Sequence, residues 1–414
     1  VGLFLHALPV ARKGRMRNTI FIWFHVVQVI GVIMPVAVGG LYVNGHLHSS
    51  FYYFASPTFH ARPTSHRRSR RLSPVFSSAA ADGNICEHNE TTDEPAPLIT
   101  GVVAPLKNVG PYPCLRLCFP NLGQGVSLDF LLDTGANVNS IDTRRVQELG
   151  MPMVASSKDL PFVESVGVGG SSAPGDIYQL GDCCLDGLPA DQSFTFMRNL
   201  TAASLPIATP VGDGLLGLGF MFSFPAGVEF DWHGTNGDPP TMIFYYGSTI
   251  SKEVIKGMTQ IPLERLAGQI LSLKVYVNGV KFPALLDTGS PITVLNPQAA
   301  KEAGIDIVKE TTLEHKKQKQ TVGDNILMVG GVDGGRVELH RSASPVSVSA
   351  GQNVSMGEGY VYVGDLPGLA LVGGLGDTAP PAVVLGLDYL RRTYRMILCV
   401  SENEVWFEEL KPSA

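Results

Sequence analysis

Apolar and polar residues alternate along most of the chain after residue 98, in short runs separated by glycine and proline. Such alternation in residues 113–120 and again in 271–284 predicts β-strands with one buried face. The Asn278-Gly279 pair within the second stretch predicts a two-residue hairpin turn. The 46 glycines and 29 prolines favour many short strands and turns over long helices. The pattern therefore predicts an all-β protein.

One apolar run occurs twice. Leu-Leu-Asp-Thr-Gly places Asp133 directly after a predicted buried strand, and the same five residues place Asp287 after another, an offset of 154 positions. An unpaired carboxylate loses its hydration when it is buried, so an aspartate at a buried strand end is costly. Its recurrence in the same context indicates that the position serves chemistry.

The surroundings of the two aspartates match in order. Each is followed by a short helical pattern, a glycine-rich hairpin, an apolar-apolar-Gly element and a closing strand. These four elements fall at residues 143–151, 164–178, around Gly217 and at 227–232 in the first repeat, and at 297–305, 327–339, around Gly386 and at 403–409 in the second. A repeat of this length is a lobe rather than a solenoid unit. We expect lobes at residues 98–250 and 251–414, linked near residues 247–257.

The paired motifs resemble those of two-lobed aspartic proteases, over roughly residues 99–410. The short repeats, a hairpin in each, and the phrase "VVLGLDYL" are similar to retropepsins, whereas "DGLLGLG" is closer to pepsins. The resemblance implies two homologous retropepsin-like β-barrel lobes related by pseudo-twofold symmetry, like a retropepsin dimer fused into one chain.

The resemblance also implies an aspartic endopeptidase that hydrolyses peptide bonds with a water activated by Asp133 and Asp287. It needs no metal or cofactor, takes a peptide or protein as substrate, and is expected to act as a monomer that forms an intramolecular pseudo-dimer. Thr134 and Thr288 would hydrogen-bond across the lobe interface. The remaining expected site residues are Gly135, Gly289 and Ser290 beside the dyad, Val168, Gly169, Gly170, Gly330, Gly331 and Val332 in substrate-covering flaps, and Gly217 and Gly386 as bracing positions.

The two loops differ at one position, where Ala136 in the first corresponds to Ser290 in the second. A hydroxyl that donates to a carboxylate lowers its pKa, so we expect Asp287 to be the anion and Asp133 the protonated partner. The alternative is that Ser290 only caps its loop. We also expect Gly135 and Gly289 to allow a tight backbone turn.

Charge separates the chain into two parts. No Asp or Glu precedes Asp82, whereas nine Lys or Arg do, which leaves 22 basic and 37 acidic residues in the remainder. The rest of the chain, with this excess of acidic residues, is a poor partner for nucleic acid. The sequence contains no HExxH motif, which would indicate a metal hydrolase. A retropepsin-like module that binds peptides or proteins without cutting them is the alternative function.

Residues 1–97 are expected to be a targeting or membrane segment followed by a basic linker. Residues 19–42 contain no Lys, Arg, Asp or Glu and are long enough to cross a bilayer. Residues 49–81 are rich in Ser and Arg and free of acid, which is typical of a transit peptide. Two interpretations stay open: a plastid address reached by the secretory route, or a retained membrane anchor with a basic stalk.

Overall fold

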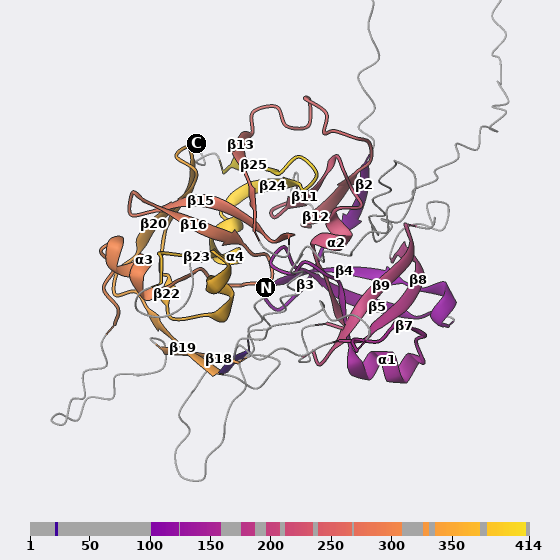
Figure 1. The fold of residues 1–414 in the computed structure, drawn as a ribbon. Helices are drawn as coiled ribbons and strands as arrows, with labels where there is room; N and C mark the ends of the chain where they lie inside the picture. Colours follow the sequence, from indigo (N-terminus) through magenta and orange to yellow (C-terminus); the bar gives the residue numbers. More distant parts are fainter. Residues whose placement is uncertain are drawn as a thin grey trace, which may run out of the picture.

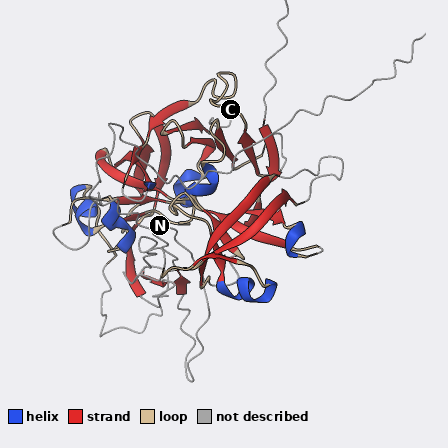
Figure 2. Ribbon diagram, turned by 45° about the vertical axis from the view of Figure 1, so that its right-hand side comes forward, coloured by secondary structure: helices blue, strands red, loops and turns tan. Residues whose placement is uncertain are grey.

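The computed structural model describes residues 21–23, 101–123, 125–158, 175–186, 196–207, 212–234, 239–266, 269–308, 326–330, 336–372 and 379–410. Strands dominate these residues, and the helices are short (Figure 2). The predicted all-β class is confirmed. Strands of the first lobe lie on one side of the molecule, those of the second lobe on the other, and strands from both chain halves meet between them (Figure 1).

The described strands form three sheets. The first-lobe sheet has the order β3 (Lys107–Val109), β4 (Tyr112–Cys118), β5 (Ser127–Leu132), β10 (Gly214–Leu216), β6 (Ser140–Asp142), β9 (Met197–Leu205), β8 (Ile177–Leu185) and β7 (Met153–Ala155). The second-lobe sheet has the order β1 (Phe21–Trp23), β18 (Ile326–Gly330), β19 (Arg336–Arg341), β22 (Tyr362–Val363), β17 (Val294–Leu295), β23 (Val383–Leu385), β16 (Val280–Leu286), β15 (Leu271–Val277), β20 (Val346–Ala350) and β21 (Val354–Gly359), with β14 (Glu264–Arg265) beside β15. The shared sheet has the order β13 (Thr259–Pro262), β25 (Glu404–Glu409), β24 (Thr393–Cys399), β11 (Gly227–Asp231), β12 (Thr241–Tyr245) and β2 (Gly101–Pro105).

The hairpin predicted at Asn278-Gly279 joins β15 to β16. Both residues have positive φ, 49° at Asn278 and 80° at Gly279, as the favoured two-residue turn requires. β16 then leads directly to Asp287. The turn therefore sets the register of the strand that delivers the second aspartate.

Both predicted helices form, and each begins at a side-chain cap. Asp142 accepts from the Arg144 amide to start α1 (Thr143–Leu149), and Asn296 accepts from the Ala299 amide to start α3 (Pro297–Glu302). Short helices also follow the apolar-apolar-Gly elements. These are α2 (Leu218–Met221) and α4 (Leu387–Leu390). Elsewhere in the described residues lie the 3-10 helices η1 (Pro120–Leu122) and η4 (Pro367–Leu371).

The shared sheet joins the two halves of the chain through β11 and β24, which pair antiparallel. We expected residues 403–409 to be the counterpart of 227–232. That correspondence is wrong. β11 is the first strand after α2, and the first strand after α4 is β24 (Thr393–Cys399), whereas residues 403–409 form the next strand, β25. The alternating pattern alone does not show which strand pairs at the centre of a sheet.

Four phenylalanine rings pack together around α2, one from α2, one from β12 and two from the segments just before β9 and just after α2. Phe196, Phe220, Phe224 and Phe244 are almost fully buried, with ring centroids 4.6–6.2 Å apart in the pairs that contact. Burying a phenylalanine contributes about 1.5–3 kcal/mol. The cluster packs the shared sheet against the element that braces the first aspartate loop.

Within the described residues, no helix has the length and apolar character needed to span a membrane. Of the hydrophobic segment 19–42, only Phe21–Trp23 is described, as strand β1. The rest of the expected targeting region at 1–97 lies outside the described residues.

Candidate active site

Asp133 and Asp287 end equivalent strands in the two lobes. β10 pairs parallel with β5, and β23 pairs parallel with β16, so each aspartate leaves the sheet beside an apolar-apolar-Gly strand. The Asp133 amide donates to the Leu216 carbonyl at 2.9 Å, and the Asp287 amide donates to the Leu385 carbonyl at 3.1 Å. Both aspartate side chains are fully buried.

Backbone amides of each loop support its carboxylate. Asp133 Oδ1 accepts from the Gly135 amide at 2.8 Å and from the Ala136 amide at 3.1 Å. Asp287 Oδ1 accepts from the Gly289 amide at 2.8 Å. In both loops the next amide, that of Ala136 or Ser290, also lies 3.3 Å from the backbone carbonyl of its aspartate. Amide donors favour the charged form of a carboxyl group, so the amides of both loops support an anion at the dyad.

The two loops bond to each other through the threonines. Thr134 Oγ1 donates to the Leu286 carbonyl at 2.7 Å and accepts from the Thr288 amide at 2.9 Å. Thr288 Oγ1 donates to the Leu132 carbonyl at 2.7 Å and accepts from the Thr134 amide at 3.0 Å. All four bonds are buried and cross between the lobes. The structure thus places Asp133 and Asp287 side by side in a symmetric frame.

Glycine is required at position 289 because the neighbouring Asp133 leaves no room for a side chain. A Cβ built there would lie 2.6 Å from Asp133 Cγ, closer than real contacts allow. Its φ lies outside the left-handed region, so the expected tight turn is not what demands glycine at this position. The Asp133 carboxyl group packs directly on the backbone of the opposite loop, because Gly289 leaves room for it.

Burial raises the pKa of both aspartates, because a carboxylate loses its hydration in the interior. The pKa of Asp287 is raised well above its usual range, since the negative charge of Asp133 adds to the effect of burial. The backbone amide bonds of each loop act in the opposite direction and lower the pKa of its aspartate. Burial and the closeness of the two carboxyl groups therefore favour one shared proton on the pair, and which aspartate holds that proton stays a prediction.

The Ser290 hydroxyl has a different partner from the one expected. Its Oγ donates to the Ile292 carbonyl at 2.6 Å instead of to Asp287. The expectation of a hydroxyl bond to the carboxylate is wrong, and the alternative of a loop-capping serine is the one the geometry supports.

Gly217 and Gly386 lie against the backbones of the two aspartate loops, as expected for bracing positions. A Cβ at Gly217 would lie 2.6 Å from the Ala136 carbonyl oxygen, and one at Gly386 would lie 2.3 Å from that of Ile292. The amides that follow both glycines bond to the loops, Leu218 N to Ala136 O at 2.8 Å and Leu387 N to Ser290 O at 2.7 Å. The close approach, rather than any unusual φ, demands glycine at both positions.

A buried pair in the second lobe was not predicted. Thr293 Oγ1 donates to Asp388 Oδ1 at 2.7 Å and accepts from the Gly386 amide at 3.0 Å. In the first lobe Asn139 takes the equivalent place, and its Oδ1 accepts from the Gly217 amide at 3.1 Å. The offset of 154 positions aligns Asn139 with Thr293. Comparing these two polar residues could have drawn attention to Thr293 and its partner Asp388. Burial raises the pKa of Asp388 to about 6.

The expected flap residues are mostly outside the described part of the chain. Gly330 ends β18, which pairs antiparallel with β19 as the predicted second hairpin requires. The other five expected flap residues, Val168, Gly169, Gly170, Gly331 and Val332, lie outside the described residues.

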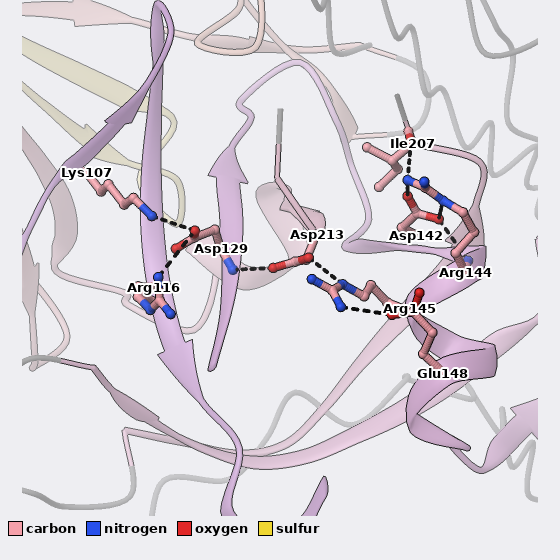
Figure 3. A network of polar contacts seen from close by, with 9 residues as sticks. All are labelled: Lys107, Arg116, Asp129, Asp142, Arg144, Arg145, Glu148, Ile207 and Asp213. Atoms are coloured by element: carbon pink, nitrogen blue, oxygen red, sulfur yellow. Dashed lines mark hydrogen bonds and ion pairs between the residues drawn. The ribbon is translucent and has the colours of Figure 1, made fainter. Parts of the chain in front are cut away.

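A separate charged cluster ties together the outer part of the first lobe (Figure 3). Lys107 Nζ bonds Asp129 Oδ2 at 2.7 Å, and Arg145 Nε bonds Asp213 Oδ1 at 2.7 Å. Asp213 Oδ2 also accepts from the Asp129 amide at 2.9 Å. These charges balance and are partly solvated, so each pair contributes about 0–1 kcal/mol. The cluster aligns β5 with the start of β10 and takes no part in the dyad.

Within the described ranges, no three His, Cys, Asp or Glu side chains gather as they would to hold a metal ion. The chemistry available at the site comes from the two carboxyl groups, their amide donors and the threonine frame.

Residues 273–389 match the aspartyl protease family. No match was found among curated protein sequences. Among solved structures, the chain is similar to basic 7S globulin from soybean, with 12% identity, a TM-score of 0.40 and coverage of 75% of this chain and 95% of that one. Conglutin gamma from lupine seeds gives 12% identity, a TM-score of 0.39 and the same coverages.

A retropepsin-like aspartic protease from Rickettsia conorii is 17% identical, with a TM-score of 0.21 and coverage of 36% of this chain and 91% of that one. All three likenesses are distant. The family match covers the second Asp-Thr-Gly loop and its bracing glycine, and the first lobe repeats both. Residues 273–389 are thus similar to the aspartyl protease family.

Proposed function

We propose that this protein is an aspartic endopeptidase whose catalytic pair is Asp133 and Asp287. The observation that carries the proposal is the reciprocal bonding of Thr134 and Thr288, which holds two fully buried carboxyl groups in one symmetric frame. Two carboxyl groups in such a frame share one proton, since both cannot stay ionised at close range. The aspartyl protease match at residues 273–389 supports the same chemistry.

In the proposed reaction, the Asp133 carboxylate takes a proton from a water molecule as its oxygen attacks the peptide carbonyl carbon. The protonated Asp287 transfers its proton to the carbonyl oxygen, so that the tetrahedral intermediate forms as a neutral diol and Asp287 becomes a carboxylate. Asp133 then passes its proton to the leaving nitrogen, Asp287 takes a proton from a hydroxyl of the intermediate, and the carbon–nitrogen bond breaks. The products are a free carboxyl group and an amine.

The proposed substrate is an extended peptide lying across the dyad. By resemblance, Val168, Gly169 and Gly170 in one hairpin and Gly330, Gly331 and Val332 in the other would cover it and bond to its backbone. We propose a monomer in which the two lobes act as the two subunits of a retropepsin do. For residues 19–42 we propose membrane attachment or a cleaved plastid-targeting signal.

The test is cleavage of a mixed peptide library by the full chain between pH 3 and pH 8. Both Asp133→Asn and Asp287→Asn should abolish cleavage, and each should keep its folded structure by circular dichroism. The control Asp186→Asn removes a partly exposed partner of Arg116 and should cleave as the wild type does. A wild-type chain that binds library peptides but cuts none of them supports the alternative, a peptide-binding module.

A further inference from the structure

The first-lobe sheet closes on itself at a short seam. It runs from β4 through β5, β10, β6 and β9 to β8, and β8 then pairs antiparallel with β4, which closes a barrel. The residues paired at this seam are Leu117 with Leu185 and Cys118 with Cys184. Two cysteines therefore lie directly opposite each other where the barrel closes.

The backbone at the seam brings these cysteines within reach of a disulfide. The Asp186 amide donates to the Arg116 carbonyl at 3.1 Å, so Arg116 and Asp186 form a hydrogen-bonded pair of the ladder. Cys118 and Cys184 come two residues further along and are the next pair of this kind. The Cα atoms of such a pair are about 5.5 Å apart, and a disulfide spans about 4.4–6.8 Å between Cα atoms. Bond formation therefore needs only a small local approach of the two strands.

Both thiols lie on the outer face of the barrel. In β4 Leu117 is buried and Cys118 is partly exposed, and in β8 Leu185 is buried and Cys184 is partly exposed. Neighbouring residues of a strand point to opposite faces, so the two leucines face the core and the two cysteines face outward. A reagent in solution can thus reach the cysteine pair.

Burial distinguishes this pair from the other cysteines in the described part of the chain. Cys114, Cys183 and Cys399 are buried, and burial raises the pKa of each thiol to about 12. Those three stay protonated at neutral pH, and a cysteine attacks a disulfide only as its thiolate. An external oxidant is therefore directed to Cys118 and Cys184.

We propose that Cys118 and Cys184 form a reversible disulfide that closes the first-lobe barrel covalently, with a low-molecular-weight disulfide as the oxidant. The thiolate of one cysteine attacks a sulfur of the oxidant, forms a mixed disulfide and releases one thiol. The thiolate of the second cysteine then attacks the protein sulfur of that mixed disulfide and releases the second thiol. Two electrons pass from the cysteine pair to the oxidant, and the two protons lost by the cysteines end on the released thiols.

The bond would restrain the part of the lobe that carries the first aspartate. The chain between Cys118 and Cys184 contains β5, which ends next to Asp133, together with β6, α1 and β7. A crosslink that closes so long a loop restricts the unfolded chain strongly and so favours the folded one. Because the bond would lie on an exposed face, a thiol reductant can reverse it.

Peptide mapping of the oxidised wild-type chain tests the bond directly. The full chain is incubated with oxidised glutathione, remaining thiols are blocked with iodoacetamide, and the digest is analysed by mass spectrometry without reductant. We expect one linked peptide pair that contains Cys118 and Cys184, and we expect dithiothreitol to separate it. The oxidised chain should also melt about 5–10 °C above the reduced chain.

Variants assign the rise in melting temperature to the pair. Cys118→Ser and Cys184→Ser should each lose the linked peptides and the difference between oxidised and reduced melting temperatures. The control Cys183→Ala removes the adjacent, core-facing thiol and should keep both. Each variant is compared with its own reduced form, so a change in its intrinsic stability does not enter the comparison.

Recovery of Cys118 and Cys184 as alkylated thiols, as separate glutathione adducts or as partners of other cysteines overturns the proposal. A bond between Cys118 and Cys184 that leaves the melting temperature unchanged overturns it as well. The mapping uses the wild-type chain and therefore decides the matter even if a variant does not fold. None of these measurements needs peptide cleavage, so the result is independent of the proposed function.

Discussion

Thr134 and Thr288 exchange hydrogen bonds across the lobe interface, each hydroxyl accepting from the other residue's amide and donating to the carbonyl two residues before the other. The expected cross-lobe threonine contact is therefore present in the geometry. Each hydroxyl satisfies two buried backbone groups that belong to the opposite lobe. The spacing of the two carboxyl groups depends on these four bonds.

Replacing Thr288 by Val should therefore affect both stability and activity. It leaves the Thr134 amide and the Leu132 carbonyl unpaired in the interior, and each buried unsatisfied group costs about 1–3 kcal/mol. Thr288→Ser keeps the hydroxyl and serves as the control. Urea unfolding and kcat/KM should both fall clearly further for Val than for Ser. Equal losses in the two variants would contradict a role for the hydroxyl.

Glycine should be needed at Gly386 but dispensable at Gly219. An alanine Cβ at Gly386 would lie 2.3 Å from a backbone oxygen, whereas at Gly219 the nearest atom, the Asn137 carbonyl oxygen, is 3.3 Å away. We expect Gly386→Ala to destabilise the fold by about 1–3 kcal/mol and to lower activity severalfold. Gly219→Ala, in a helix, should be tolerated. Thermal melting and peptide cleavage measure both, and a Gly386→Ala chain as active as Gly219→Ala would refute the bracing argument.

Ser290→Ala should leave the acidic limb of the pH–rate profile in place, because the Ser290 hydroxyl bonds the Ile292 carbonyl rather than Asp287. The loss of that bond should lower stability by about 1 kcal/mol. kcat/KM measured from pH 3 to pH 8 tests the first statement, and chemical unfolding at neutral pH tests the second. An upward shift of the limb would restore the hydroxyl-to-carboxylate bond that the sequence suggested.

Asp388 should make stability depend on pH in a defined window. Burial raises its pKa in the folded chain to about 6, above the ordinary value of 3.8. The folded state therefore holds the proton where the unfolded state has lost it. The stability that this proton contributes is complete below about pH 4 and is lost as pH rises through about 6. At about 1.4 kcal/mol per unit, the change is on the order of 3 kcal/mol.

Asp388→Asn removes this titrating group and keeps an oxygen that can accept from Thr293. Its unfolding free energy should vary less between pH 4 and pH 6 than that of the wild type. Urea titrations at pH 4, 5, 6 and 7 give both curves. Parallel curves would show that Asp388 does not titrate in this window.

Cutting the chain near Gly257 should give two halves that are inactive alone and active when mixed. Each half carries one aspartate, and the cut separates β11 from β24, which pair at the centre of the shared sheet. Cleavage by the first half alone would contradict a shared dyad. Sedimentation of each half identifies self-association, which could otherwise mimic that result.

The sequence by itself determined the local elements and the repeated plan. The hairpin at Asn278-Gly279 and the helix starts at Asp142 and Asn296 depend on residues close in the chain, whose turn and cap preferences are intrinsic. The duplicated Leu-Leu-Asp-Thr-Gly run likewise indicated that two aspartates share one site, because two lobes built alike present equivalent loops.

The tertiary structure alone decided how the site is asymmetric. Ser290 has a carboxylate and a carbonyl within reach of its loop, and only the folded backbone determines that the Ile292 carbonyl is its partner. Gly289 must be glycine because the other lobe's carboxyl group packs on it. These contacts join segments far apart in sequence, so their geometry follows from packing and register rather than from local preference.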